Sequence, residues 1–167
     1  MPDPAPSNIE SLWLLRDFLS QVEKILAAVA YNPGPVIRSR HHDKLRAAWD
    51  DVRPKFSLAI SSLQEPSASN ITERLAEVGL TGPQLVFKLS IFRQAHDELT
   101  DHGMPAAEEK PKKMRWWERW VSLLKPTLKA ANVILGSLAK VLPPVEAIKE
   151  FKEAVEAAVN LGRAVPK

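Results

Sequence analysis

Apolar residues recur every three or four positions along most of the chain, and this spacing limits its fold more than any other feature. Residues three and four apart share one face of an α-helix, whereas alternate residues share one face of a strand. The spacing therefore predicts an amphipathic helix over residues 8–31. Its apolar face is formed by Leu15, Phe18, Leu19, Val22, Ile25, Leu26 and Val29.

Prolines and glycines divide the rest of this pattern into further helices. The stretch "NPGP" at 32–35 ends the first helix, because proline cannot continue a helix and glycine allows a turn. The same criteria predict helices beginning at 36 or 43 and reaching 64, then at 70–78, from 81 to about 102, at 114–142 and at 145–161. Long helices, short corners and no strand pattern predict an all-α, antiparallel bundle of four to six helices.

Two of the long helices contain a proline opposite their apolar stripe. One stripe consists of Leu45, Trp49, Val52, Phe56, Ala59 and Leu63, and the other of Trp117, Val121, Leu124, Leu128, Ala131, Leu135, Leu138 and Leu142. Each stripe keeps its register through a proline, at Pro54 and at Pro126. A proline on the solvent side bends a helix without ending it, so we predict two proline-bent helices.

The composition between the helices suggests how the chain is organised. Residues 1–7, "MPDPAPS", are rich in proline and lack the features of a secretory signal, so we expect a disordered tail. Residues 8–102 form a helical bundle in this interpretation, and residues 103–113, "GMPAAEEKPKK", form a linker. Residues 114–165 then form a helical hairpin that packs on the bundle, giving one domain overall.

Enzymatic activity finds little support in the sequence. The chain has no cysteine, which excludes disulfides and thiolate chemistry, and it has no phosphate-binding glycine loop or nucleophile elbow. Glu98 and His102 share a helix face, but their spacing matches no common metal motif, and His96 is expected as a partly buried core residue. We expect no catalytic residue, no metal and no cofactor. No run approaches the roughly 18 apolar residues of a membrane span, and we expect a cytoplasmic protein.

Positive charge is concentrated in one stretch, although the net charge is only +3. Residues 110–129 contain seven basic residues and one acid, Glu118, whereas acids outnumber bases in the rest of the chain. The basic residues are Lys110, Lys112, Lys113, Arg115, Arg119, Lys125 and Lys129. Such a cluster creates a local field that attracts anionic surfaces.

Three tryptophans lie in the same stretch. Trp117 falls on the apolar stripe and is expected in the core, whereas Trp116 and Trp120 fall to one side of it. Basic residues opposite an apolar arc flanked by tryptophan are typical of a helix that lies at a membrane surface. The candidate membrane- or partner-binding residues are Lys112, Lys113, Arg115, Trp116, Arg119 and Trp120.

Three other interpretations of this stretch stay open. It can be an ordinary core helix with a solvated basic face, or it can bind an acidic protein partner. Nucleic acid would be attracted by the same charge, but no base-reading motif accompanies it, so we regard this partner as unlikely. We expect a non-enzymatic bundle acting at an anionic membrane surface, and as the alternative an adaptor that binds an acidic protein.

The tract 131–160, "ANVILGSLAKVLPPVEAIKEFKEAVEAAVN", combines a helix of low charge, a proline corner and an amphipathic closing helix. In these features it resembles the HeLo-like and necroptosis-kinase-type four-helix bundles, which are effector domains of cell-death proteins. The resemblance implies a cell-death or defence effector that targets membranes. It also implies a closed bundle that exposes a terminal helix when a partner oligomerises it, and hence a homo-oligomer on activation.

Overall fold

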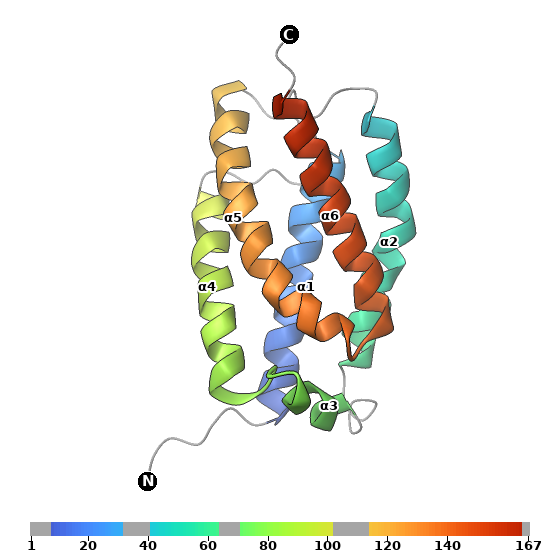
Figure 1. The fold of residues 1–167 in the computed structure, drawn as a ribbon, viewed down its shortest axis with the longest axis vertical. Helices are drawn as coiled ribbons and strands as arrows, with labels where there is room; N and C mark the ends of the chain where they lie inside the picture. Colours follow the sequence, from blue (N-terminus) through green and yellow to red (C-terminus); the bar gives the residue numbers. More distant parts are fainter. Residues whose placement is uncertain (1–7, 32–40, 64–70, 102–113, 165–167) are drawn as a thin grey trace.

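A computed structural model describes residues 8–31, 41–63, 71–101 and 114–164 of the chain (Figure 1). These residues form helices and no strand, which confirms the all-α prediction. The helices are α1 (Asn8–Tyr31), α2 (His42–Ser62), α3 (Ile71–Glu77), α4 (Gly82–Asp101), α5 (Met114–Ala139) and α6 (Pro143–Ala164). The predicted tail at 1–7 and the predicted linker at 103–113 lie outside the described residues.

The five long helices form a closed ring, and the short α3 lies at one end (Figure 1). Neighbours around the ring are α1 and α2, α2 and α6, α6 and α5, α5 and α4, and finally α4 and α1. Helices α1, α4 and α6 run in one direction, and α2 and α5 run in the other. An odd number of helices cannot alternate around a ring, so one pair of neighbours has to be parallel. That pair is α1 and α4, which have the least contact of all neighbours.

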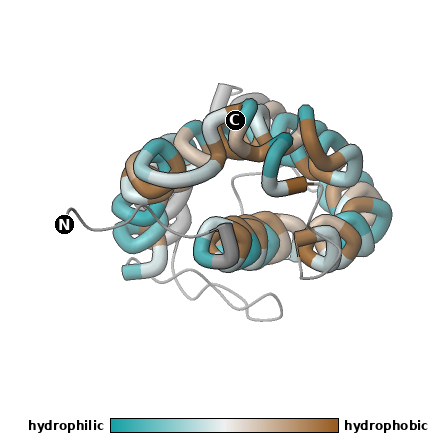
Figure 2. The backbone as a smooth tube through the Cα atoms, turned by 90° about the horizontal axis from the view of Figure 1, so that it is seen from below, coloured by the Kyte–Doolittle hydropathy of each residue, from teal (hydrophilic) through white to brown (hydrophobic). Residues whose placement is uncertain are grey.

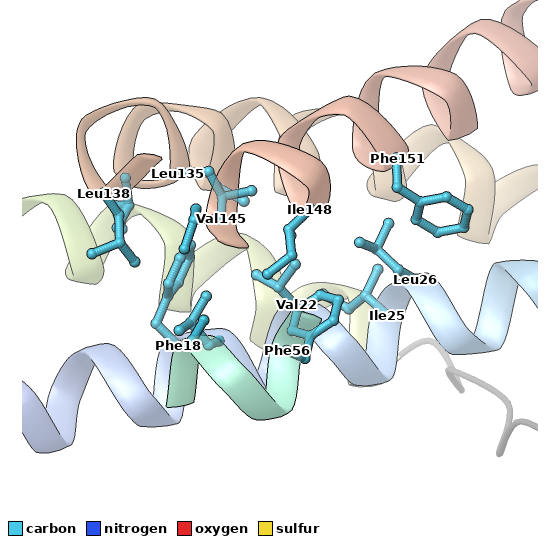
Figure 3. Packing of buried hydrophobic residues seen from close by; sticks show 14 of the residues in the cluster. Phe18, Val22, Ile25, Leu26, Phe56, Leu135, Leu138, Val145, Ile148 and Phe151 are labelled. Carbon is cyan, nitrogen blue, oxygen red and sulfur yellow. The ribbon is translucent and has the colours of Figure 1, made fainter. Parts of the chain in front are cut away.

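The core lies between the helices, and α1 supplies much of it. All seven residues of the apolar face predicted for α1 are at most 1% exposed. Figure 2 shows the bundle from below, and many of the hydrophobic residues lie on the sides of the helices that face the interior. Figure 3 shows side chains of α1, α2, α5 and α6 meeting there, among them Val22, Phe56, Leu135 and Ile148.

Aromatic rings connect the helices across this core. The indole of Trp49 on α2 lies 5.7 Å from the ring of Phe56 and 5.6 Å from the ring of Phe151 on α6. Phe18 of α1 meets Phe92 of α4 edge to face at 4.9 Å. Each such ring contributes roughly 1.5–3 kcal/mol by leaving water. The Phe18–Phe92 contact therefore holds α4 to α1 where these two helices otherwise touch little.

Both prolines lie inside continuous helices, as the register of the apolar stripes predicts. Pro54 is exposed on α2 and Pro126 is exposed on α5. The stripe residues of α2 are at most 8% exposed, and those of α5 from Leu124 onward are at most 3% exposed. The described residues thus keep a buried face on each helix on both sides of its proline.

A buried hydroxyl beside Pro126 joins α5 to α4. Thr127 is fully buried, and its Oγ1 lies 2.8 Å from the carbonyl oxygen of Leu123 and 3.2 Å from that of Ala95. The hydroxyl has one hydrogen to donate, and it is shared between these two carbonyls, one in the preceding turn of α5 and one on α4. This contact positions the middle of α5 against its neighbour.

A glycine turn after α3 directs the chain into α4. Gly79 has a left-handed φ of 72°, and the N–H of Leu80 donates to the carbonyl of Leu75 at 2.9 Å. The N–H of Gly79 donates to the carbonyl of Ala76 at 3.2 Å. These two bonds form a Schellman motif, and the buried Leu75 and Leu80 supply its apolar contact.

Candidate functional site

Four of the six predicted site residues lie on the first turns of α5. The backbone is helical from Met114, so Arg115 and Arg119 are one turn apart, as are Trp116 and Trp120. The side chains of these four residues are outside the described part of the structure, and so are Lys112 and Lys113 entirely. The joint exposure of the six residues therefore stays a prediction.

The second half of the basic stretch is described in full. Lys125 and Lys129 are exposed, one turn apart on α5. They line a hollow of about 250 Å³ between α5 and α6. The other lining residues are Leu124, Leu128, Asn132, Lys152, Glu156 and Val159. Three lysines and one carboxylate thus surround a small cavity with apolar walls.

Lys152 is the most unusual residue of this site. It is only 2% exposed, and its Nζ lies 3.3 Å from Oε1 of Glu156, one turn further along α6. The Glu156 side chain is 33% exposed, so this carboxylate keeps part of its contact with water. A buried ammonium group is costly unless it is well paired and hydrogen-bonded. A single contact of this length leaves the ammonium able to take further acceptors, because it carries three donors.

A second polar group in the hollow has no partner. The Oδ1 of Asn132 is buried and accepts no hydrogen bond. Leaving such a group unpaired costs about 1–3 kcal/mol. The walls beside it are Leu124, Leu128 and Val159, each at most 2% exposed. The arrangement combines donors for an anion with an apolar lining, and the unpaired Oδ1 is buried beside it.

The basic stretch is evident in the sequence, whereas Lys152, Asn132 and Glu156 were not predicted as site residues. A signal for Lys152 is present, because Ile148, Lys152, Val155 and Val159 follow one another at spacings of four, three and four residues. This places a lysine on the apolar stripe of α6, a position where charge is rarely buried without a partner. Asn132 and Glu156 follow no such pattern and became apparent only when the two helices were placed side by side.

Other candidates for chemistry are weaker in the described part of the chain. His96 is half-buried with its ring centroid 5.7 Å from that of Phe92, in agreement with the core position expected for it. Its Nδ1 lies 3.4 Å from the carboxylate of Asp97. Within the described ranges no three His, Cys, Asp or Glu side chains gather as a metal site would require. His102 lies outside those ranges.

Large apolar side chains are exposed on the other side of the ring. Trp13 of α1 is 64% exposed and Phe87 of α4 is 67% exposed. A hollow of about 190 Å³ lies between these two helices, where the parallel pair has little contact. Its apolar lining includes Leu14, Phe18, Val86, Leu89 and Phe92. The sequence patterns did not predict this exposed surface. They assigned the apolar residues of α1 to one buried face, and Trp13 lies outside that face.

The α5–α6 hollow is thus a described place where three lysines meet polar and apolar groups. None of the helices, as far as they are described, is both long and apolar enough to cross a bilayer. No protein-family model, no curated protein and no solved structure matches this chain.

Proposed function

We propose that this protein acts without catalysis at anionic membrane surfaces, through the basic stretch at 110–129. The observation that carries the proposal is the charge of this stretch, seven basic residues against one acid. A basic residue near an anionic surface contributes roughly 1 kcal/mol. Lys125 and Lys129 support the proposal because both are exposed on α5. Trp116 and Trp120 would place their rings at the level of the headgroups.

Within this activity we assign the protein the role of a cell-death or defence effector. The support is the resemblance of residues 131–160 to effector bundles that act on membranes. In this role the closed ring is the resting form, and oligomerisation on activation exposes a terminal helix. The loosely packed pair of α1 and α4 offers a place where such a ring could open.

Binding to vesicles tests the proposal. The full chain is mixed with vesicles of phosphatidylcholine alone and of phosphatidylcholine with phosphatidylserine, and bound protein is measured by co-sedimentation at low and high salt. We expect binding to the anionic vesicles only, weakened by salt because ions screen the attraction. No binding to anionic vesicles at low salt would reject the proposal.

Two variants locate the binding surface, and a third controls for net charge. Trp116→Ala and the double variant Lys112→Ala/Lys113→Ala should each weaken vesicle binding. The double variant Lys44→Ala/Lys55→Ala removes the same charge from exposed positions of α2 and should leave binding nearly unchanged. Equal losses in both double variants would mean that net charge, not this stretch, attracts the protein.

An adaptor that binds an acidic protein partner is the second candidate. It is favoured by the exposure of Lys125 and Lys129, because basic side chains on α5 would attract an acidic protein surface as they would an anionic lipid. Reversing the charge of Arg115 and Arg119 to Glu should then abolish capture of the partner in a pull-down. Retention of every captured protein by this variant would count against the adaptor.

A further inference from the structure

We propose that the hollow between α5 and α6 binds the phosphate head of an anionic amphiphile, with the first carbons of its apolar chain. The inference deepens the proposed function and rests on it, because it gives one membrane component a defined site. It goes further in assigning a ligand class to Lys125, Lys129 and Lys152.

The charge of the lining selects an anion. Lys125, Lys129 and Lys152 bring three ammonium groups to the hollow against the single carboxylate of Glu156. Lys125 and Lys129 stand on α5 and Lys152 stands on α6, so an anion between the helices would be approached from both. Hydrogen bonds from an ammonium to an ionised oxygen are stronger than neutral ones and are strengthened further where water is excluded.

The polar groups favour phosphate over carboxylate. A phosphate monoester offers three terminal oxygens, one for each of the three lysines that line the hollow. An ionised carboxylate offers only two oxygens and would leave one lysine without a partner in the ligand.

The walls and the size limit what else enters. Leu124, Leu128 and Val159 provide an apolar surface for carbon atoms beside the head. About 250 Å³ is less than the roughly 300–1,000 Å³ of pockets that enclose drug-sized ligands. The hollow therefore accommodates a head and a few methylene groups, and the rest of an acyl chain would lie outside it.

The buried position of Lys152 supports a binding role. Apolar residues of similar volume often replace a buried ion pair without loss of stability. Lys152 occupies the apolar stripe of α6, where a methionine would pack as well, and it has one contact at 3.3 Å. A ligand that accepts hydrogen bonds from the other N–H groups of Lys152 would explain why a charged residue, and not an apolar one, occupies this position.

A soluble short-chain lipid tests the site directly. Dihexanoyl phosphatidic acid, kept below its micelle concentration, is titrated into the full chain by calorimetry, with inorganic phosphate as the probe for the head alone. We expect saturable binding of the lipid and at least about tenfold weaker binding of phosphate. If phosphate bound as tightly as the lipid, the assignment of an amphiphile as the ligand would be wrong. If the lipid did not bind, the proposed site would be wrong.

Three variants make the assignment specific. Lys152→Met should weaken lipid binding about tenfold or more, since a charged hydrogen bond is lost, while thermal stability is unchanged or raised. Lys129→Met, at the exposed rim, should weaken it a few-fold without a folding risk. Glu156→Gln should strengthen binding, because it removes the competing carboxylate. The matched control is Lys55→Met, an exposed lysine of α2, which should change nothing.

A purely structural Lys152–Glu156 pair gives the opposite pattern. Lys152→Met and Glu156→Gln would then each lower thermal stability, and neither would change the affinity for the lipid. That result overturns the proposal. Vesicles that contain phosphatidylserine, with or without a minor fraction of phosphatidic acid, identify the source of the ligand. If phosphatidic acid strengthens vesicle binding by the wild type but not by Lys152→Met, the ligand of the site is a membrane lipid. The same variant should keep its binding to phosphatidylserine vesicles.

The two proposals fail in different ways. Vesicle binding by the wild type without any binding of the short-chain lipid rejects the hollow and leaves the membrane surface intact. Binding of the short-chain lipid without any vesicle binding rejects the proposed function and assigns the hollow to a soluble phosphorylated amphiphile.

Discussion

Helices α2 and α5 both continue through a proline, but they bury different kinds of residue. Each continues through an exposed proline, Pro54 in α2 and Pro126 in α5. The buried face of α2 consists of apolar and aromatic residues, among them Trp49, whose ring contacts α6 and whose indole N–H has no partner. The buried face of α5 contains Thr127, and the helix borders the hollow that holds Lys152 and Asn132.

This difference separates stability from function within one bundle. Around α2, the packing of large apolar and aromatic side chains explains the buried stripe, and the unpaired N–H of Trp49 is part of a ring that this packing buries. Around α5, the buried polar groups include an unpaired amide oxygen and a lysine with one partner, which packing alone would not favour. Proteins tolerate such costs where they serve binding, and three substitutions in α2 and α5 test whether the two regions differ in this way. A fourth substitution concerns α1.

The largest effect is expected for Trp49→Ala on α2. Removing a fully buried indole leaves a cavity beside Phe56 and Phe151, and the free energy of unfolding should fall by about 3–5 kcal/mol. Denaturant unfolding measures the change. Leu58→Ala, at a 53% exposed position of the same helix, is the control and should stay within about 0.5 kcal/mol of the wild type. A loss below about 1 kcal/mol for Trp49→Ala would show that α2 is not the tightly packed region.

Thr127→Val tests the polar contact on the buried face of α5. The substitution keeps the shape but removes the hydroxyl that serves the carbonyls of Leu123 and Ala95. We expect a loss of about 0.5–1.5 kcal/mol in unfolding free energy, because the hydrogen bond between α5 and α4 is lost. Thr127→Ser keeps the hydroxyl and gives the reference for the missing methyl group. A valine variant as stable as the wild type would mean that the contact does not join α5 to α4.

Asn132→Leu should raise the free energy of unfolding, whereas Thr127→Val should lower it. The unpaired Oδ1 is removed and apolar surface is added beside Leu128, so stability should rise by about 1 kcal/mol. Thermal unfolding measures the change. A variant that is less stable than the wild type would show that Asn132 has a structural role.

The smallest effect concerns Glu23 of α1 and its dependence on pH. Burial raises the pKa of the Glu23 carboxyl above its ordinary value of 4.5, and the charges of Arg53 and Lys24 oppose this shift only in part. The folded state therefore holds this proton more tightly than the unfolded state. Stability from this group is present at low pH and is lost as the pH rises through the folded pKa.

Glu23→Gln removes this penalty. We expect the variant to unfold at a slightly higher urea concentration than the wild type at neutral pH. The difference should shrink as the pH falls toward and below 4.5, where both side chains are uncharged. Glu153→Gln, an exposed position of α6, serves as the control. A difference that grows on acidification would contradict the sign of the shift.

The helices could be predicted because their information is local. The stripe of α1, the glycine turn at Gly79 and the continuity of α2 through Pro54 each depend on residues within a few turns of one another. The charge of the stretch at 110–129 could also be counted directly. The prediction of six site residues remains a prediction, because exposure depends on what packs beside the first turns of α5.

The sequence by itself determined the helices, their buried faces and the place where positive charge is concentrated. Only the tertiary structure decided that α1 and α4 form the loose parallel pair, because a ring of five requires one such pair and nothing local selects it. It also decided that Lys125, Asn132 and Lys152 line one hollow. These residues lie on two helices, and their proximity depends on how α5 and α6 pack, which the pattern within either helix does not contain.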